Sequence, residues 1–164
     1  MLPRCLIRAL LAALSLFLVC LVCRPPLVLA QAQTSTEPWT AALSVQPADL
    51  AKEMAGKSAP TVLCVGFQRL YTAGHIKGAR YHGTGGNADG LAEIKKWAKS
   101  LPRSTNLVIY CGCCPMENCP NIRPAFIALR EMGFASLRVL ILPHSFAVDW
   151  VEKGLLYDKG ASGR

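Results

Sequence analysis

Residues 106 to 123 read Asn-Leu-Val-Ile-Tyr-Cys-Gly-Cys-Cys-Pro-Met-Glu-Asn-Cys-Pro-Asn-Ile-Arg. The run 107–110 is apolar, β-branched and aromatic, which is typical of a strand buried on both faces. The glycine and prolines that follow favour a loop. From Ile122, apolar residues recur at three- and four-residue spacings until Gly133, which predicts a helix with Asn121 as its N-cap. The stretch therefore predicts a strand, a loop and a helix.

The predicted loop contains four cysteines, which are Cys111, Cys113, Cys114 and Cys119. Cys111 directly follows the strand, and Gly112 after it lets backbone N–H groups approach. The next helix presents unpaired N–H groups and its positive dipole end to the loop, and these favour a thiolate. We therefore expect Cys111 to have a lowered pKa and to act as a nucleophile. Cys64, within another apolar run, is predicted to be a small core residue.

The other three loop thiols admit three interpretations. In the favoured one they relay sulfur or resolve an oxidised Cys111. The expected partner is Cys114, because the two have the Cys-x-x-Cys spacing of a reversible redox couple, whereas Cys113 is expected to point elsewhere. A structural Cys114–Cys119 disulfide comes second. A soft metal ion such as Zn²⁺ or Cu(I), with His144 as a further ligand, comes last, so we expect neither a metal nor another cofactor.

Strands and helices alternate along the rest of the chain. Apolar runs and helical periodicity predict strands at 44–45, 61–65 and 137–142 and helices at 47–55, 88–101 and 144–153. This alternation, with strands that are apolar throughout, predicts an α/β fold whose central, mainly parallel sheet is covered by helices on both faces. Ligands of such sheets bind at the carboxyl ends of strands, which is where Cys111 lies.

The N-terminal region has the layout of a secretory signal. Arg4 and Arg8 precede an uncharged run at 9–23, which is short for a membrane span, and small residues follow near Ala30. We expect export to the periplasm or secretion, or an N-terminal membrane tether if this segment is not cleaved. The predicted organisation is a signal peptide or anchor at 1–30, a linker at 31–42, a domain at 43–158 and a tail at 159–164.

The charge of the chain narrows its partners. The net charge is +8, and removing residues 1–30 takes away three arginines and leaves +5. The remaining Lys and Arg residues are scattered among acids, which argues against nucleic-acid binding and supports at most an attraction for small anions. We expect a monomer or a weak dimer.

At Gly74-His75-Ile76-Lys77-Gly78-Ala79 the chain resembles the rhodanese family, in which a Gly-His-Ile-Pro-Gly-Ala turn occupies this place. The run Val108-Ile109-Tyr110-Cys111, the loop and the helix after it agree in order and spacing. The resemblance implies a three-layer rhodanese-like domain. It also implies a sulfurtransferase that carries sulfane sulfur on Cys111 as a persulfide, with a small anionic or thiol sulfur donor and acceptor.

The sequence departs from the family at two places. Cys64 and Gly66 stand where the family usually has Asp and Arg, and the active-site loop is longer, with three extra cysteines. Besides Cys111, we name Gly112, Cys113, Cys114 and Arg123 as substrate-binding or loop residues, with Arg123 either holding an anion or lying on the surface. Two alternatives remain, a thiol–disulfide redox protein using Cys111 and Cys114 and a soft-metal module built on the 111–119 loop. The motif residues Gly74, His75 and Gly78 are expected to be structural.

Overall fold

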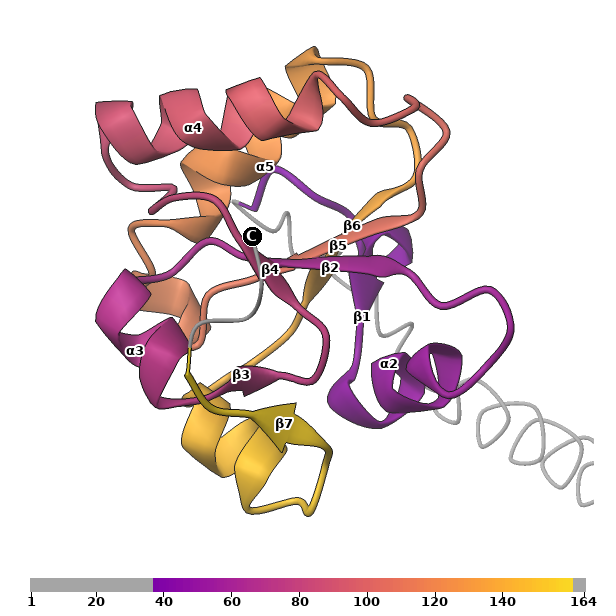
Figure 1. Ribbon diagram of the computed structural model, residues 1–164, viewed down its shortest axis with the longest axis vertical. Helices are drawn as coiled ribbons and strands as arrows, with labels where there is room; N and C mark the ends of the chain where they lie inside the picture. Colours follow the sequence, from indigo (N-terminus) through magenta and orange to yellow (C-terminus); the bar gives the residue numbers. More distant parts are fainter. Residues whose placement is uncertain (1–36, 161–164) are drawn as a thin grey trace, which may run out of the picture. The chain divides into compact units, whose positions relative to one another are not determined.

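A central parallel sheet organises the protein, whose computed structural model describes residues 37–160. Each neighbouring pair of strands in this sheet is parallel. In spatial order the strands are β1 (Ser44–Val45), β6 (Leu137–Leu140), β5 (Leu107–Tyr110), β2 (Thr61–Cys64) and β4 (Arg80–Tyr81) (Figure 1). A second, antiparallel pair joins β3 (His75–Ile76) and β7 (Tyr157–Asp158).

Helices lie on both sides of the sheet, as Figure 1 shows. They are α2 (Pro47–Met54), α3 (Gln68–Ala73), α4 (Ala88–Ala98) and α5 (Ile122–Glu131), with 3₁₀-helices at Ala41–Leu43 and Met116–Asn118 and a π-helix at Ala147–Val151. Proline at the first position of α2 is favourable, because its missing N–H would be unpaired there anyway. Gly133, with φ +91°, ends the chain's helical path after α5, as predicted.

Two hydrophobic cores lie on opposite faces of the sheet. Along β5, Leu107 and Ile109 pack with α4 and α5, whereas Val108 and Tyr110 pack with residues of α2, α3 and the π-helix. All four side chains are buried, which explains the uninterrupted apolar run. The prediction of a parallel sheet covered on both faces is confirmed.

The last predicted helix, at 144–153, was wrong in its extent and type. Only Ala147–Val151 is helical, as a π-helix. The Asp149 carboxylate accepts hydrogen bonds from the backbone N–H groups of His144 (2.7 Å) and Ser145 (3.0 Å), so it holds the first residues outside the helix. The helix predicted at 88–101 ends at Ala98, and neither α3 nor β7 was predicted.

The domain begins earlier than predicted. The proposed signal peptide or anchor at 1–30 lies outside the described residues, as does the linker at 31–42 up to residue 36. Trp39, however, is 6% exposed and packs edge-on against Phe126 at 5.3 Å between ring centroids. Residues 37–42 therefore belong to the folded domain. Between residues 37 and 160, no helix is both long and apolar enough to cross a membrane.

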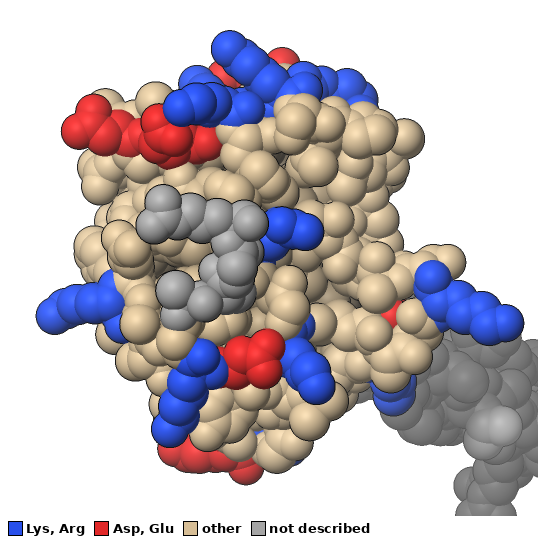
Figure 2. All heavy atoms as spheres, viewed as in Figure 1, with Lys and Arg blue, Asp and Glu red and all other residues tan. Residues whose placement is uncertain are grey.

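The charged side chains do not gather into a single basic surface on the face shown in Figure 2, where acidic groups lie among the lysines and arginines. Exposed pairs such as Lys96 with Glu93, at 3.7 Å, illustrate this mixing.

A two-pronged ion pair ties α2 to β6. Arg138 Nη1 and Nη2 donate to the two Glu53 carboxylate oxygens at 2.8 and 2.6 Å. These hydrogen bonds lower the Glu53 pKa below its ordinary value of 4.5. Since the carboxyl is bound in its charged form, its contribution to stability is present above about pH 4.5 and is lost as the pH falls through the lowered pKa.

Glu53→Gln should therefore lower the free energy of unfolding by about 1 kcal/mol at neutral pH, a modest loss because the pair is partly exposed. Urea unfolding at a series of pH values measures it, and the difference from wild type should shrink below pH 4.5. Asp49→Asn is the control, because its pair with Lys52 is exposed and 4.0 Å long. A Glu53→Gln loss that is equal at all pH values would contradict the ion-pair account.

Candidate active site

Cys111 lies at the carboxyl end of β5, where the chain leaves the sheet. Its side chain is 5% exposed. Gly112 adopts φ +69°, in the left-handed region, and an added Cβ there would lie 2.7 Å from Phe146 Cβ. The Phe146 N–H also donates to the Gly112 carbonyl at 3.1 Å. The segment that follows β6 therefore fixes the first turn of the cysteine loop.

Cys113, and not Cys114, lies against Cys111. The Sγ atoms of Cys111 and Cys113 are 3.1 Å apart, so the prediction that Cys113 points elsewhere was wrong. The cause is Gly112, whose left-handed φ turns the chain so that the next side chain returns toward Cys111. Cys114 Sγ contacts Cys113 Sγ at 3.3 Å. The thiol beside Cys111 is therefore that of Cys113, and the reversible Cys111–Cys114 disulfide stays a prediction.

Asn121 contacts this pair instead of capping α5. Its Nδ2 donates to the sulfurs of Cys111 at 3.4 Å and Cys113 at 3.5 Å, and its Oδ1 accepts from the Gly86 N–H at 3.1 Å. Asn121 occupies the N-cap position of α5, as predicted, but its side chain makes no capping hydrogen bond. Because Asn121 is 1% exposed, this bridge between the loop and residue 86 is buried and stabilises both sulfurs.

Cys119, and not Cys111, occupies the helix N-terminus. The Cys111 thiol donates to Cys119, and the backbone N–H groups of Asn121 and Ile122 add to this, so the pKa of Cys119 falls to about 6. The hydrogen bond to Cys119 and burial together raise the pKa of Cys111. The expectation of a lowered pKa at Cys111 was therefore wrong, because the long loop carries Cys119 to the helix terminus. The two pKa shifts are opposite in direction because both depend on the interaction between these neighbouring sulfurs.

The described cysteines, which are Cys64, Cys111, Cys113, Cys114 and Cys119, are all free thiols. The predicted alternative of a Cys114–Cys119 bridge is therefore not formed in this structure. Burial is the largest cause that raises the pKa of Cys114 to about 12. Cys64, 3% exposed in β2, has its pKa raised to about 12 by burial, as befits the predicted core residue.

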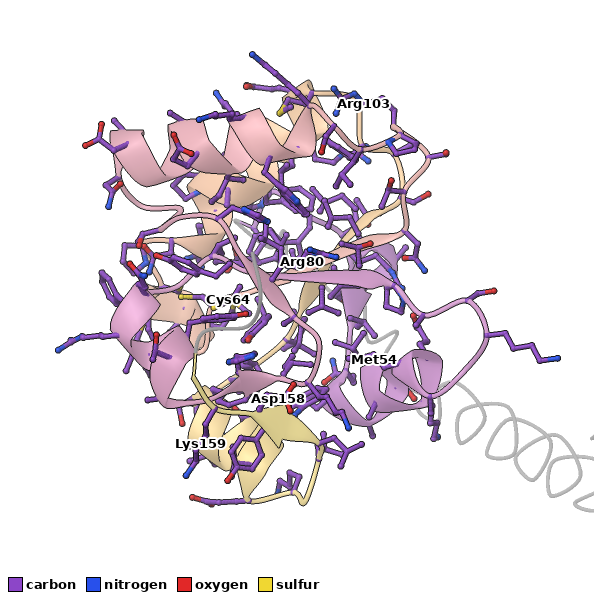
Figure 3. All side chains as sticks on the ribbon, viewed as in Figure 1. Met54, Cys64, Arg80, Arg103, Asp158 and Lys159 are labelled. Carbon is purple, nitrogen blue, oxygen red and sulfur yellow. The ribbon has the colours of Figure 1, made fainter. Side chains whose placement is uncertain are left out.

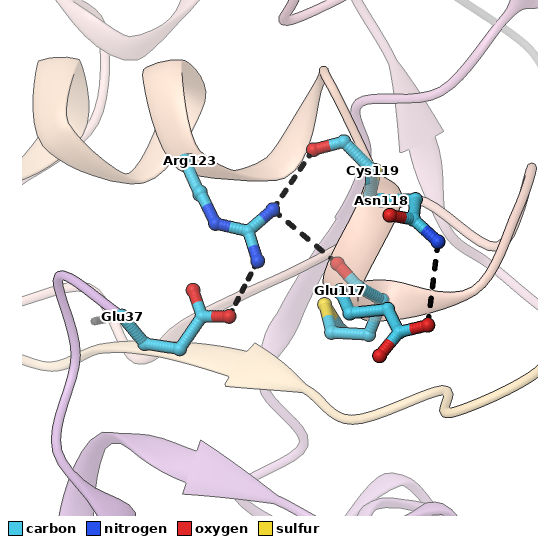
Figure 4. Close-up of polar contacts among 6 residues, drawn as sticks. Glu37, Glu117, Asn118, Cys119 and Arg123 are labelled. Atoms are coloured by element: carbon cyan, nitrogen blue, oxygen red, sulfur yellow. Dashed lines mark hydrogen bonds and ion pairs between the residues drawn. The ribbon is translucent and has the colours of Figure 1, made fainter. Parts of the chain in front are cut away.

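Arg123 holds the loop in place, as Figure 4 shows. Its Nη1 donates to the carbonyls of Cys119 at 3.1 Å and Met116 at 3.3 Å, and its Nη2 pairs with Glu37 Oε1. The guanidinium is therefore engaged with the protein itself, in neither of the two roles weighed from the sequence. Sequence reasoning missed Glu37, whose position in a presumed linker carried no signal.

A cleft of about 440 Å³ opens beside the first loop residues. Figure 3 labels two of its lining residues, Cys64 and Lys159. Aromatic and aliphatic side chains form most of its wall, and the residues that bear on the chemistry are Tyr71, Tyr110, Cys111, Cys113, Phe146 and Tyr157. An apolar cleft with reactive groups in its wall is the usual form of a small-molecule site.

The Gly-His turn supports this wall from behind. His75 is fully buried, its Nδ1 lies 2.9 Å from the Tyr71 carbonyl, and its ring stacks on Tyr71 at 4.0 Å. An added Cβ at Gly74 would lie 3.6 Å from Phe146, and Gly78 takes φ +75° in the turn. These residues contact structural partners and not the cysteine cluster.

Gly66 is a further site residue that sequence reasoning did not single out. An added Cβ there would lie 3.0 Å from the Cys111 carbonyl and 3.4 Å from its Sγ. A side chain at this position would therefore press on Cys111. The only sequence signal was the departure from the family's arginine.

Solved structures share the fold of this chain at low sequence identity. The BH2092 protein of Bacillus halodurans superposes with a TM-score of 0.55 at 20% identity, covering 71% of this chain and 76% of that one. The rhodanese-like domain of the Alr3790 protein from Anabaena sp. gives 0.52 at 21% identity, covering 74% and 89%. The chain has a rhodanese-like fold. The fold predicted from the sequence is confirmed.

This rhodanese-like domain also resembles part of a larger protein. EanB, whose structure holds a cysteine persulfide with ergothioneine, gives a TM-score of 0.53 at 18% identity over 71% of this chain and 28% of that one. No protein-family model and no curated protein matches the sequence.

Proposed function

We propose that the protein is a rhodanese-type sulfurtransferase in which Cys111 carries sulfane sulfur as a persulfide. The observation that carries this proposal is the position of Cys111, at the carboxyl end of β5 and in the wall of the apolar cleft. Asn121 Nδ2, at 3.4 Å, can stabilise a charged sulfur there. The persulfide in EanB, a protein of the same fold, supports the chemistry by analogy.

Cys119 supplies the activation that Cys111 needs. The pKa of Cys111 is raised and that of Cys119 is lowered, which makes Cys119 the thiolate that can accept the Cys111 proton. As Cys111 Sγ attacks the outer sulfur of a donor such as thiosulfate, its proton passes to Cys119 Sγ. The sulfur–sulfur bond of the donor breaks, sulfite leaves with the bonding electrons, and Cys111 retains one sulfur as the persulfide anion. Attack by an acceptor thiolate on that outer sulfur returns Cys111 as a thiolate, which recovers the proton from Cys119.

Cys113 offers a second outcome for the loaded enzyme. Its sulfur lies 3.1 Å from Cys111 Sγ, so it can attack that atom and form a Cys111–Cys113 disulfide, while the proton of the Cys113 thiol passes to the outer sulfur, which leaves as hydrosulfide. An external dithiol would then reduce the disulfide. This contact favours a thiol–disulfide role as the second candidate function, with Cys113 in place of the Cys114 expected from spacing.

The cleft suggests the kind of donor and acceptor. Its wall is mainly apolar, and Lys159 adds a positive charge. We propose small anionic or thiol compounds with an apolar body.

The signal-like segment at residues 1–30 supports a further proposal that the protein is exported to the periplasm or secreted, or tethered by that segment. We also propose that it works as a monomer or weak dimer.

Sulfur loading tests the proposed function directly. Reduced, metal-free protein incubated with thiosulfate should gain the mass of one sulfur, cyanide should remove it, and peptide mapping should place it on Cys111. Cys114→Ser is the matched control, because it removes a loop thiol that does not line the cleft and should load fully. Absence of cyanide-labile sulfur, or its location on another cysteine, would refute the proposal.

A further inference from the structure

The cysteine loop also brings three sulfur atoms together, which the single persulfide on Cys111 does not explain. The Sγ atoms of Cys111, Cys113 and Cys119 all lie within 4.8 Å of one another. They come from the end of β5, the turn after Gly112 and the residues just before α5, so separate parts of the loop converge on one point. Two of the three side chains are buried. In the proposed sulfur transfer Cys111 carries the sulfur and Cys119 accepts its proton, so loading alone does not explain why a third sulfur, that of Cys113, converges with them.

We propose that Cys111, Cys113 and Cys119 bind one Cu(I) ion in trigonal coordination. Thiolates are soft ligands, and among biological cations they select Cu(I) and Zn²⁺. With metal–sulfur bonds of about 2.3 Å, the three sulfurs of a trigonal site lie about 4 Å apart. The present spacing, from 3.1 Å between Cys111 and Cys113 to at most 4.8 Å within the trio, needs shifts of less than about 1 Å to reach this geometry.

The number of sulfurs favours Cu(I) over Zn²⁺. Structural Zn²⁺ sites have four ligands, and the group that converges in the described residues has three. His144, named from the sequence as a further ligand, instead pairs its Nδ1 with Asp149 at 2.9 Å. Cys114 could supply a fourth sulfur only by turning inward from its contact with Cys113. The prediction that the loop holds no metal rested partly on the difficulty of aiming two adjacent cysteines at one ion. The trio does not use both members of the adjacent pair Cys113 and Cys114.

The surroundings suit an anionic copper–thiolate centre. Asn121 Nδ2 donates to two of the sulfurs, and the N–H groups of Asn121 and Ile122 donate to the third. Such outer contacts orient ligands and stabilise thiolate charge. Arg123 donates a hydrogen bond to the Cys119 carbonyl. This holds Cys119 in place while the guanidinium stays outside the sulfur cluster. The site is thus held by the fold before any ion arrives.

Copper titration under anaerobic conditions tests this inference. Reduced protein should retain one equivalent of Cu(I) against a chromophoric Cu(I) chelator and show the luminescence of a shielded copper–thiolate centre. Cys111→Ser, Cys113→Ser and Cys119→Ser should each weaken binding at least about 100-fold, at the upper limit of an outer-shell loss. Cys114→Ser and Cys64→Ala should stay within a few-fold of wild type, and circular dichroism checks the fold of each variant.

Three results would overturn the inference. One is retention of less than about a tenth of an equivalent of copper. Another is unchanged copper affinity in the variants of the trio. The third is preferential retention of Zn²⁺ that depends on Cys114 as strongly as on the others, which would show a tetrahedral site. Sulfur loading is measured on metal-free protein, so a failure to bind copper leaves the proposed sulfurtransferase function standing. A protein that binds copper but takes up no sulfur refutes the sulfurtransferase proposal and not the copper site.

Discussion

Cys111→Ser is expected to lower the rate of sulfur transfer from thiosulfate at least about 1,000-fold, because the covalent carrier is then absent and the rest of the site has no equivalent nucleophile. Turnover with cyanide or a thiol as acceptor measures this loss. Cys111 is 5% exposed, and serine keeps its shape closely, so the fold should be retained. Circular dichroism and the unfolding midpoint check that point.

The companion variants separate the roles of the neighbouring thiols. Cys119→Ser keeps the nucleophile but removes the group that accepts its proton, so we expect a loss of about 100-fold, in the range of general base catalysis. Cys113→Ser should remain within about tenfold of wild type, because its thiol acts only after sulfur is loaded. If Cys113→Ser fell as far as Cys111→Ser is expected to fall, the partly exposed Cys113 would be the carrier.

The sequence was sufficient for the architecture because its signals are local. The apolar run of β5 and the helical spacing after Ile122 are written into consecutive residues, and they placed Cys111 at a strand end within the correct fold. The Gly-His turn at residues 74–79 was a second local signal for this fold. Burial on both faces then followed from the uninterrupted apolar strands.

The interior of the loop could not be predicted, because its contacts join residues far apart in sequence. Asparagine is a favoured N-cap residue, yet the side-chain oxygen of Asn121 accepts a hydrogen bond from the backbone N–H of Gly86, 35 positions away. Arg123 is drawn to Glu37, 86 positions away, and to carbonyls that exist only when the loop is folded. The pKa is lowered at Cys119 and not at Cys111, where it was predicted, for the same reason. The lowering depends on which sulfur lies at the N-terminus of α5.

Gly112→Ala should be strongly destabilising and should also disturb the active-site loop. The residue has φ +69°, and the new Cβ would lie 2.7 Å from Phe146 Cβ, with Leu142 Cδ1 at 3.3 Å. Backbone strain costs about 1–2 kcal/mol and forced overpacking adds about 1–3 kcal/mol. We expect the free energy of unfolding to fall by about 3 kcal/mol, measured by urea unfolding.

Gly78→Ala provides the matched control for Gly112→Ala. Gly78 has φ +75°, almost the same backbone strain, but nothing lies within 4 Å of its added Cβ. It should lose only about 1 kcal/mol and load sulfur normally. Gly112→Ala should also fail to load sulfur at temperatures where it remains folded, because relief of the clash moves Cys111 and Cys113 away from Asn121. Equal losses of stability in the two variants would show that Phe146 does not constrain the loop, and the site would then owe its geometry to the backbone of Gly112 alone.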